Sequence, residues 1–272
     1  FVITEHNHQT HLSCLARPTG QILWQKPLAY VGRRTRSTNV PDPLRGTCLV
    51  SSGVIVCVLH DGMAVGVRPS DGQLLWATVF ADPRSVDQIM QFQRGLAAYL
   101  SSGDGVSVVP ASSDSFVVLM HPNGTHVVAI EPDTGRVRWQ VARAAVGSAS
   151  IDGEIDQYIA GLTDSQVIMV GQRHCRALDV RTGDQRWTVE TPESSGRAEV
   201  SQNRCLLPQH DGQLVTIDLT NGTLHRSRQR FLPELVDEPW GTIVSTDARI
   251  FAVTPVSVTS FVRCDAALDH DE

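Results

Sequence analysis

One alternation of apolar and polar residues recurs along this chain. Between residues 129 and 139 it runs as two apolar residues, a polar turn closed by Gly135, and a strand with Trp139 four residues beyond the glycine. Glycine permits the left-handed backbone that such a turn needs, so it marks a tight connection between two strands. The pattern returns at residues 14–24, 66–76, 177–187 and, with arginine in place of tryptophan, 216–226. One supersecondary unit is therefore repeated five times.

Each repeat predicts three antiparallel strands. In the second repeat, an apolar run at 54–59 is followed by a turn at 60–62, a strand at 63–67, a glycine turn ending at 72, and a strand at 73–79. Asp-Gly and Asn-Gly are residues that tight hairpins favour, because both central positions can take a positive φ. The order strand, turn, strand, turn, strand is an antiparallel meander.

The middle strands of these meanders are apolar on both faces. Residues 54–59 are all apolar, and the runs 116–120 and 167–170 are similar. An antiparallel sheet with one wet face would alternate between apolar and polar residues. Each small sheet must therefore lie between two neighbours. The third strand is more polar, as Arg136 and Arg138 show by alternating with Val137 and Trp139, which predicts an outer strand at a half-exposed rim.

The spacing of the turn glycines predicts the fold class. Gly20, Gly72, Gly135, Gly183 and Gly222 are 52, 63, 48 and 39 residues apart, which brackets the 40–50 residues of a four-stranded propeller blade. We predict an all-β protein, a β-propeller of four-stranded antiparallel blades with about six units in view. Two arrangements stay open, a closed ring of six units or an arc of a larger ring of seven or eight blades, and we favour the arc.

We expect one propeller domain over residues 1–264 and an acidic tail at 265–272. The units are expected near 1–28, 47–80, 106–143, 148–190, 197–230 and 241–264. The fourth strand of each blade is the hardest to identify, and its candidates are 47–50, 106–109, 148–151, 197–200 and 242–245.

The tryptophans are the largest apolar side chains of the repeat. Burying one indole removes roughly 150–250 Å² from water, which at about 25 cal/mol per Å² is worth some 4–6 kcal/mol as an upper bound. We predict that Trp24, Trp76, Trp139 and Trp187 wedge each unit against the next, with the turn glycines giving room for close approach. The alternative is a row of exposed rings that stack nucleic-acid bases or sugars.

Composition narrows the range of partners. The 41% hydrophobic and 19% charged residues are typical of a folded protein. A net charge of −6 without a strongly basic stretch argues against a general nucleic-acid binder. No apolar run approaches the roughly 18 residues of a membrane span.

The repeats AIEPDTGRVRW, GVRPSDGQLLW and ALDVRTGDQRW resemble those of the pyrroloquinoline-quinone-type β-propellers. That superfamily includes quinoprotein alcohol dehydrogenases and the propeller lipoprotein of the outer-membrane β-barrel assembly machine. The resemblance implies that the four tryptophans dock between blades. Arg226 departs from the pattern, which implies a looser or wetter fifth junction. The motif is specific for the fold and not for the cofactor, since many members bind no quinone.

The resemblance also raises a quinone site. Quinone-dependent members typically hold the cofactor beside calcium, with a disulfide between adjacent cysteines and a catalytic aspartate. No two of the six cysteines here are adjacent, and no calcium-ligand set is recognisable. We therefore predict no pyrroloquinoline quinone, no metal and no catalytic residue. Cys48 and Cys57 could lie on adjacent strands and pair in an oxidising compartment, and this stays open.

Two further groups of residues could act as sites. His60 and His210 each precede Asp-Gly and lie twelve residues before Gly72 and Gly222 respectively, and this repetition favours a hairpin turn over a metal ligand or a base. Arg226, Arg228 and Arg230 alternate and share one face of a strand. A solvated, partly ion-paired rim is the simpler interpretation, and contact with an anion or a partner protein is the alternative.

Two functions from different classes follow. The first is a non-catalytic propeller module that binds other proteins, as an interaction scaffold or as the ectodomain of a larger bacterial envelope protein, in an extracytoplasmic compartment and as part of a longer chain. The alternative is a segment of a pyrroloquinoline-quinone-dependent dehydrogenase. A sensor domain attached to other regions is a third option.

Overall fold

The computed structural model describes residues 1–6, 9–30, 46–59, 62–80, 110–120, 125–143, 155–201, 203–210, 213–226, 241–246, 249–254 and 257–262. Regular structure in these ranges is entirely β, arranged as six antiparallel sheets. Consecutive strands pair within each sheet, so every sheet is a meander. The predicted all-β propeller class is confirmed. No helix in these ranges could cross a membrane.

The first and last sheets have three strands each. The first is made of β1 (Val2–His6), β2 (Gln9–Leu15) and β3 (Ile22–Tyr30). The last is made of β20 (Thr242–Ser245), β21 (Arg249–Val253) and β22 (Val258–Val262).

The four sheets between them have four strands each. The second sheet contains β4 (Thr47–Ser51), β5 (Val54–Val58), β6 (Met63–Val67) and β7 (Leu74–Val79). The third contains β8 (Ala111–Ser112), β9 (Val117–Met120), β10 (His126–Ile130) and β11 (Val137–Ala142). The fourth contains β12 (Asp156–Leu162), β13 (Gln166–Gly171), β14 (His174–Asp179) and β15 (Gln185–Glu190). The fifth contains β16 (Glu199–Ser201), β17 (Arg204–Pro208), β18 (Leu214–Asp218) and β19 (Leu224–Arg226).

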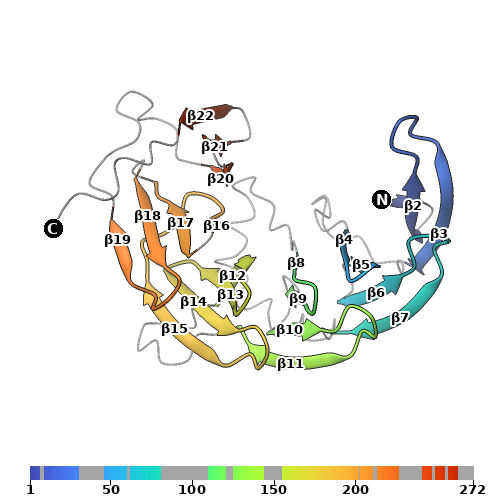
Figure 1. Cartoon of the computed structure of the whole chain (residues 1–272), viewed down its shortest axis with the longest axis horizontal. Helices are drawn as coiled ribbons and strands as arrows, with labels where there is room; N and C mark the ends of the chain where they lie inside the picture. The colour runs from blue at the N-terminus through green and yellow to red at the C-terminus, as the bar shows by residue number, and fades with distance from the viewer. Residues whose placement is uncertain are drawn as a thin grey trace, which may run out of the picture.

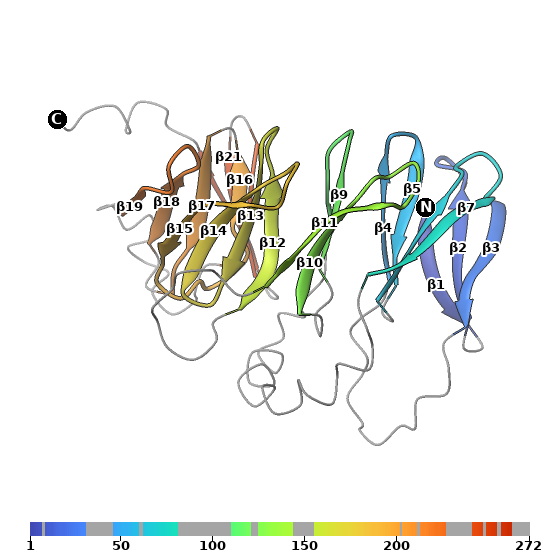
Figure 2. The same cartoon turned by 90° about the horizontal axis from the view of Figure 1, so that it is seen from below.

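The six sheets fan along an open arc (Figure 1). The last strands of the first five sheets, β3, β7, β11, β15 and β19, follow its outer margin, and the sheets stand side by side when viewed from below (Figure 2). The first and sixth sheets lie at opposite ends of the arc. We call the outer margin formed by these five strands the rim.

The middle strands form the core, as their two-sided apolar pattern predicts. Every residue of β5, β9 and β13 is buried. Val54, Val56 and Val58 of β5 pack with apolar residues of the third sheet, whereas Ile55 and Cys57 pack with Leu12 of the first sheet. Strand β5 therefore contributes to two cores, one on either side.

The inner strands were only partly predicted. Strands β4 and β20 begin at the expected residues, and β16 overlaps its candidate at 197–200. The inner strand of the third sheet is instead β8, and that of the fourth is β12, each later than the candidates at 106–109 and 148–151. Those two candidates lie outside the described residues. The prediction placed each candidate just before an apolar run, whereas β12 begins later, at a charged residue.

That charged residue, Asp156, is fully buried between the third and fourth sheets. Its carboxylate accepts hydrogen bonds from Nε (3.1 Å) and Nη2 (2.5 Å) of Arg176, and its Oδ1 lies 3.1 Å from His174 Nε2. Arg143, which follows β11, donates from Nε to the Asp156 carbonyl oxygen at 3.1 Å. The buried charges are thus hydrogen-bonded as burial requires, and they tie the third sheet to the fourth.

Two of the cysteines lie on adjacent strands of the second sheet. Cys48 in β4 is directly opposite Cys57 in β5, and both are free thiols. Burial raises the pKa of both thiols, and the raised pKa of Cys57 owes a smaller part to its neighbour Cys48. Protonated thiols of this kind are poor nucleophiles.

Candidate interaction surface

Four of the tryptophans join one sheet to the next in the same way. Each lies on the outer strand of its sheet, and its indole N–H donates to the carbonyl oxygen three residues before the turn glycine of the following sheet. The four bonds are Trp24 to Pro69 (3.0 Å), Trp76 to Pro132 (2.8 Å), Trp139 to Val180 (2.9 Å) and Trp187 to Leu219 (3.0 Å). We call each of these contacts an indole joint.

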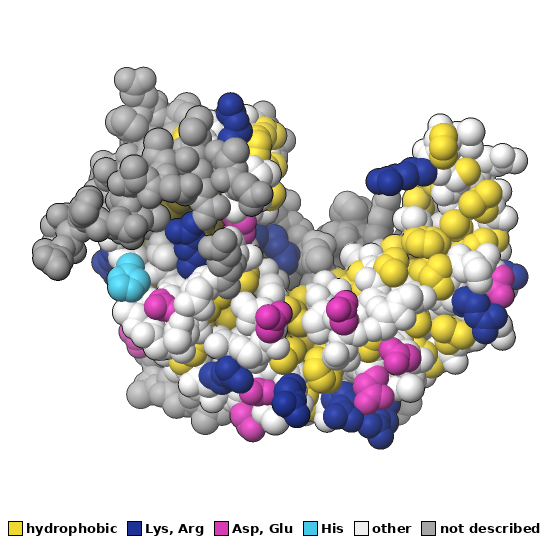
Figure 3. Space-filling view, viewed as in Figure 1, with side chains coloured by type: hydrophobic (Ala, Val, Ile, Leu, Met, Phe, Trp, Pro, Cys, Tyr) yellow, Lys and Arg dark blue, Asp and Glu magenta, His cyan; other side chains and the backbone are white. Residues whose placement is uncertain are grey.

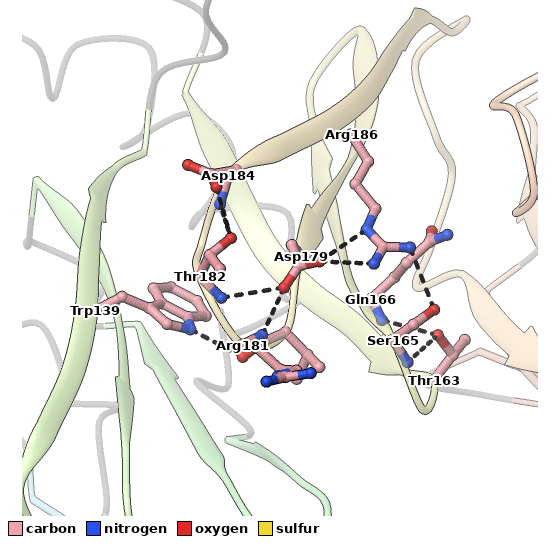
Figure 4. A network of polar contacts seen from close by, with 10 residues as sticks. Trp139, Thr163, Ser165, Gln166, Asp179, Arg181, Thr182, Asp184 and Arg186 are labelled. Carbon is pink, nitrogen blue, oxygen red and sulfur yellow. Dashed lines mark hydrogen bonds and ion pairs between the residues drawn. The ribbon is translucent and has the colours of Figure 1, made fainter.

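In each joint the ring lies against the turn glycine. A Cβ atom added at any of the four glycines would come within 2.4–2.9 Å of the indole, closer than side chains pack; the pairs are Gly72 with Trp24, Gly135 with Trp76, Gly183 with Trp139, and Gly222 with Trp187. These glycines also have φ values between 68° and 79°, which glycine adopts readily. Figure 4 shows Trp139 reaching the turn that carries Asp179 and Thr182. Trp139 is buried, and the other three tryptophans are half-buried.

Of the other candidate residues named from the sequence, the structure describes only some. Gly20 has the same backbone as the other turn glycines, with a φ of 69°, but it is exposed. Arg226 ends β19 as an exposed side chain. Arg228, Arg230, His60 and the Asp-Gly after His210 lie outside the described residues. Gly62, next to His60, has a φ of 80°, and its amide donates to the Leu59 carbonyl, as in a tight turn.

The rim of the first two sheets exposes large aliphatic side chains. Their exposed fractions run from 40% to 69%, and they belong to β3 and β7: Ile22, Leu23, Leu74, Leu75 and Val79. Figure 3 shows hydrophobic side chains gathered over the N-terminal sheets, while charged side chains lie along the lower margin. We call these five residues the N-terminal rim.

The rim of the third and fourth sheets is built differently at equivalent positions. The residue three places after the turn glycine is Arg138 in the third sheet and Arg186 in the fourth. Each pairs with a carboxylate four places before that glycine, at 3.0 Å to Glu131 and 2.6 Å to Asp179. In the first two sheets the same position holds Leu23 or Leu75. The ion pairs of one half of the rim are thus replaced by aliphatic side chains in the other.

These carboxylates are stabilised in their charged form. The pKa of Glu131 is lowered, first by the hydrogen bond from the Thr134 hydroxyl and then by Arg136. The pKa of Asp179 is lowered mainly by its hydrogen bond with Arg186 (Figure 4). The polar half of the rim is therefore charged at neutral pH.

Comparison with known families agrees with this repeat architecture. The model of a family described as outer membrane protein assembly factor BamB matches residues 100–254, more than half of the chain. The chain belongs to the BamB family. No curated protein sequence matches it significantly.

A solved structure shows the same fold. BamB from Moraxella catarrhalis superposes with a TM-score of 0.55 at 14% identity, covering 96% of this chain and 72% of that one. A europium-containing methanol dehydrogenase matches with a TM-score of 0.47 at 12% identity, covering 82% of this chain and 49% of that chain. The resemblance to pyrroloquinoline-quinone-type propellers is confirmed by the BamB family match.

The described residues of this BamB-family chain contain no group of three or more His, Cys, Asp or Glu side chains placed to hold a metal ion. The fully buried carboxylate among them, Asp156, already accepts hydrogen bonds from Arg176 and lies within hydrogen-bond distance of His174.

Sequence reasoning missed the N-terminal rim. It treated the third strand of every repeat as alike, from the alternation at Arg136–Arg138. The signal was present in the pairs Ile22-Leu23 and Leu74-Leu75, where two consecutive apolar residues precede the tryptophan. Because a strand at the rim can bury only one of two neighbouring side chains, such a pair indicates exposed apolar surface.

Proposed function

We propose that this BamB-family chain is a non-catalytic propeller module that binds other proteins through its N-terminal rim. The observation that supports the proposal is the row of exposed aliphatic side chains on β3 and β7. Contiguous apolar surface on a soluble domain marks an interaction site more often than scattered apolar residues do. The rim of the third and fourth sheets carries ion pairs at the equivalent positions, so it serves as an internal control surface that should not bind the same partner.

The exposed leucines also lie on edge strands, which supports the proposal. β3 and β7 are the last strands of their sheets, and natural edge strands are usually protected from association by charged residues. Arg138 and Arg186 provide such protection on β11 and β15. Leu23 and Leu75 do not provide it on β3 and β7. A partner with an apolar surface would cover these leucines and remove them from water.

The family description suggests the setting. BamB is named for outer membrane protein assembly, so we propose an extracytoplasmic location in the cell envelope and protein partners there. We also propose that residues 1–264 act as one propeller domain, displayed as a scaffold or ectodomain, with residues 265–272 as an acidic tail.

Site-specific photo-crosslinking in cells tests the proposal. A photoreactive amino acid is placed at position 75, and in a separate protein at position 186, which is the equivalent position of the fourth sheet. We expect position 75 to give a discrete adduct with an envelope protein, identified by mass spectrometry, and position 186 to give none. Equal adducts from both positions, or none from position 75, would contradict the proposal.

A matched pair of variants separates binding from folding. Leu23→Arg with Leu75→Arg installs the arginine that the third and fourth sheets already carry at this position, so the fold should tolerate it. We expect the melting temperature to change little, while the adduct from a photoreactive residue at position 79 is lost. Arg186→Leu, the reverse change on the fourth sheet, should leave that adduct intact.

A further inference from the structure

The hairpin between β4 and β5 has a loop of two residues. Ser51 pairs with Val54, so the loop is Ser52 and Gly53. Their φ values are 48° and 73°, and a positive φ at both loop residues is the mark of a type I′ turn. In such a turn the carbonyl of the first residue accepts a hydrogen bond from the amide of the fourth. Ser51 and Val54 are therefore a hydrogen-bonded pair.

The position of this turn decides what kind of pair the two cysteines form. Opposite residues in an antiparallel ladder alternate between hydrogen-bonded and non-hydrogen-bonded pairs. Cys48 and Cys57 are the third pair beyond Ser51 and Val54, in a ladder without a register shift. They are therefore a non-hydrogen-bonded pair, in which the Cα atoms are about 4.5 Å apart and the side chains approach most closely.

This separation suits a disulfide. A disulfide usually joins Cα atoms about 4.4–6.8 Å apart and Cβ atoms about 3.5–4.5 Å apart. Opposite side chains of a non-hydrogen-bonded pair have their Cβ atoms about 4.5 Å apart. Cys48 and Cys57 also point to the same side of the sheet, since both pack with the core that contains Leu12. Rotation about the two Cα–Cβ bonds is thus enough to bring the sulfurs together without moving either strand.

Cys175 and Cys205 are the rival pair. The pKa of Cys175 is raised first by its hydrogen bond with Cys205 and then by burial, so these two thiols also lie close together. They belong to different sheets, on β14 and β17, within one shared core. No strand register sets the separation of their Cα atoms, and packed sheets lie about 10 Å apart. The hairpin pair is therefore better placed for a bond.

The two thiols of the hairpin differ in access. Cys48 is half-buried, whereas Cys57 is fully buried. Burial raises the pKa of both thiols, so thiolate is scarce and an external reagent meets Cys48 first. Attack by the Cys48 thiolate on an external disulfide gives a mixed disulfide and one free thiol, and Cys57 then displaces the second thiol. The two cysteines lose two electrons and two protons, which reduce the external disulfide to two thiols.

We propose that Cys48 and Cys57 form a reversible cross-strand disulfide, in which Cys48 exchanges with an external disulfide and Cys57 is its resolving partner. The bond closes residues 48–57 into a loop and fastens the inner strand β4 to β5, in a sheet that carries part of the N-terminal rim. Its formation in the cell rests on the extracytoplasmic location proposed above, because cytosolic thiols are kept reduced. The purified chain tests the bond itself, independently of the crosslinking experiment.

Peptide mapping locates the bond. Trypsin leaves Cys48 and Cys57 on one peptide, residues 46–84, and the other four cysteines on four separate peptides. The folded chain is equilibrated with oxidised glutathione at mildly alkaline pH, where thiolate is more abundant. It is then denatured, treated with a maleimide and digested. We expect peptide 46–84 to carry no maleimide and to have two hydrogens fewer than its reduced form. Treatment with dithiothreitol before the maleimide should restore two reactive thiols.

Thermal unfolding measures what the bond does. A disulfide restricts the unfolded chain, so we expect the oxidised chain to melt at least about 4 °C above the same chain in dithiothreitol. Cys48→Ser should abolish this difference. Cys14→Ser is the matched control, since Cys14 is also half-buried, and it should keep the difference. Each variant is compared with itself in the two redox states, so a general loss of stability does not affect the result.

Three mapping results would overturn the proposal. Two maleimides on peptide 46–84 after oxidation would show that the pair does not react. A glutathione retained on Cys48 would show that Cys57 cannot reach it. A disulfide between the peptides of Cys175 and Cys205, with peptide 46–84 still reduced, would assign the redox site to the rival pair.

Discussion

At the residue scale, two positions on different sheets act as one contact. The indole of Trp76 requires that its neighbour Gly135 has no side chain, and Gly135 requires a positive φ for its turn. The indole donor comes from Trp76, and the space for its ring comes from Gly135, 59 positions later in the chain. Losing any one of them should weaken the junction between the second and third sheets.

The two requirements on the glycine can be separated by substitution. Gly20→Ala meets only the backbone penalty, about 1–2 kcal/mol for a left-handed residue, because nothing lies near its added Cβ. Gly135→Ala meets the same penalty at a φ of 68° and also collides with Trp76. Urea unfolding should therefore show a larger loss for Gly135→Ala. Equal losses would mean that the ring yields without cost.

Residue-scale prediction from sequence worked where the signal is local. The tryptophans were found because they repeat four residues after a glycine. The buried group of Asp156, His174 and Arg176 was not found, because its members are 18 and 20 residues from Asp156 along the chain and follow no repeat. Their pairing depends on how two sheets meet, which no spacing within one strand expresses.

At the element scale, the outer strands differ more than their shared pattern suggests. The strand β11 carries ion-paired arginines, whereas β7 carries Leu74, Leu75 and Val79 in exposed positions. The sequence pattern predicted that each outer strand would be half-exposed. It did not predict which outer strands expose aliphatic side chains and which expose ion-paired arginines. Inner strands were harder still, because short strands such as β8, with two residues, leave almost no periodic signal.

The ion pairs of β11 predict a pH dependence. Because the pKa of Glu131 is lowered in the folded protein, its stabilisation is present above the ordinary glutamate pKa and is lost as pH falls through the folded value. Glu131→Gln should therefore melt below the unaltered chain at pH 7, and the difference should shrink as the pH approaches 2. A difference that stays constant over this range would indicate a role for Glu131 other than its charge.

At the scale of the whole molecule, stability should be uneven along the arc. Each sheet contacts its neighbours in the chain, so the molecule resembles a repeat array in which junctions contribute separately. The fifth junction has Arg226 in place of tryptophan. Among the described residues, the core that joins β20 and β21 to Leu214 contains three buried residues, far fewer than the core shared by the third, fourth and fifth sheets.

Hydrogen exchange checks this expectation. Amides of β20, β21 and β22 should exchange faster than those of β9, β10 and β13, because opening the sixth sheet disrupts less buried surface. The comparison is internal, so no variant is needed. Uniform protection across all six sheets would mean that the fifth junction is as strong as the indole joints.

The four indoles all point from one sheet to its successor along the chain, and none points back. Such an array has polarity, with an accepting end at Gly20 and an end at Arg226 where the series of donors stops. The two ends of the arc are therefore chemically unlike.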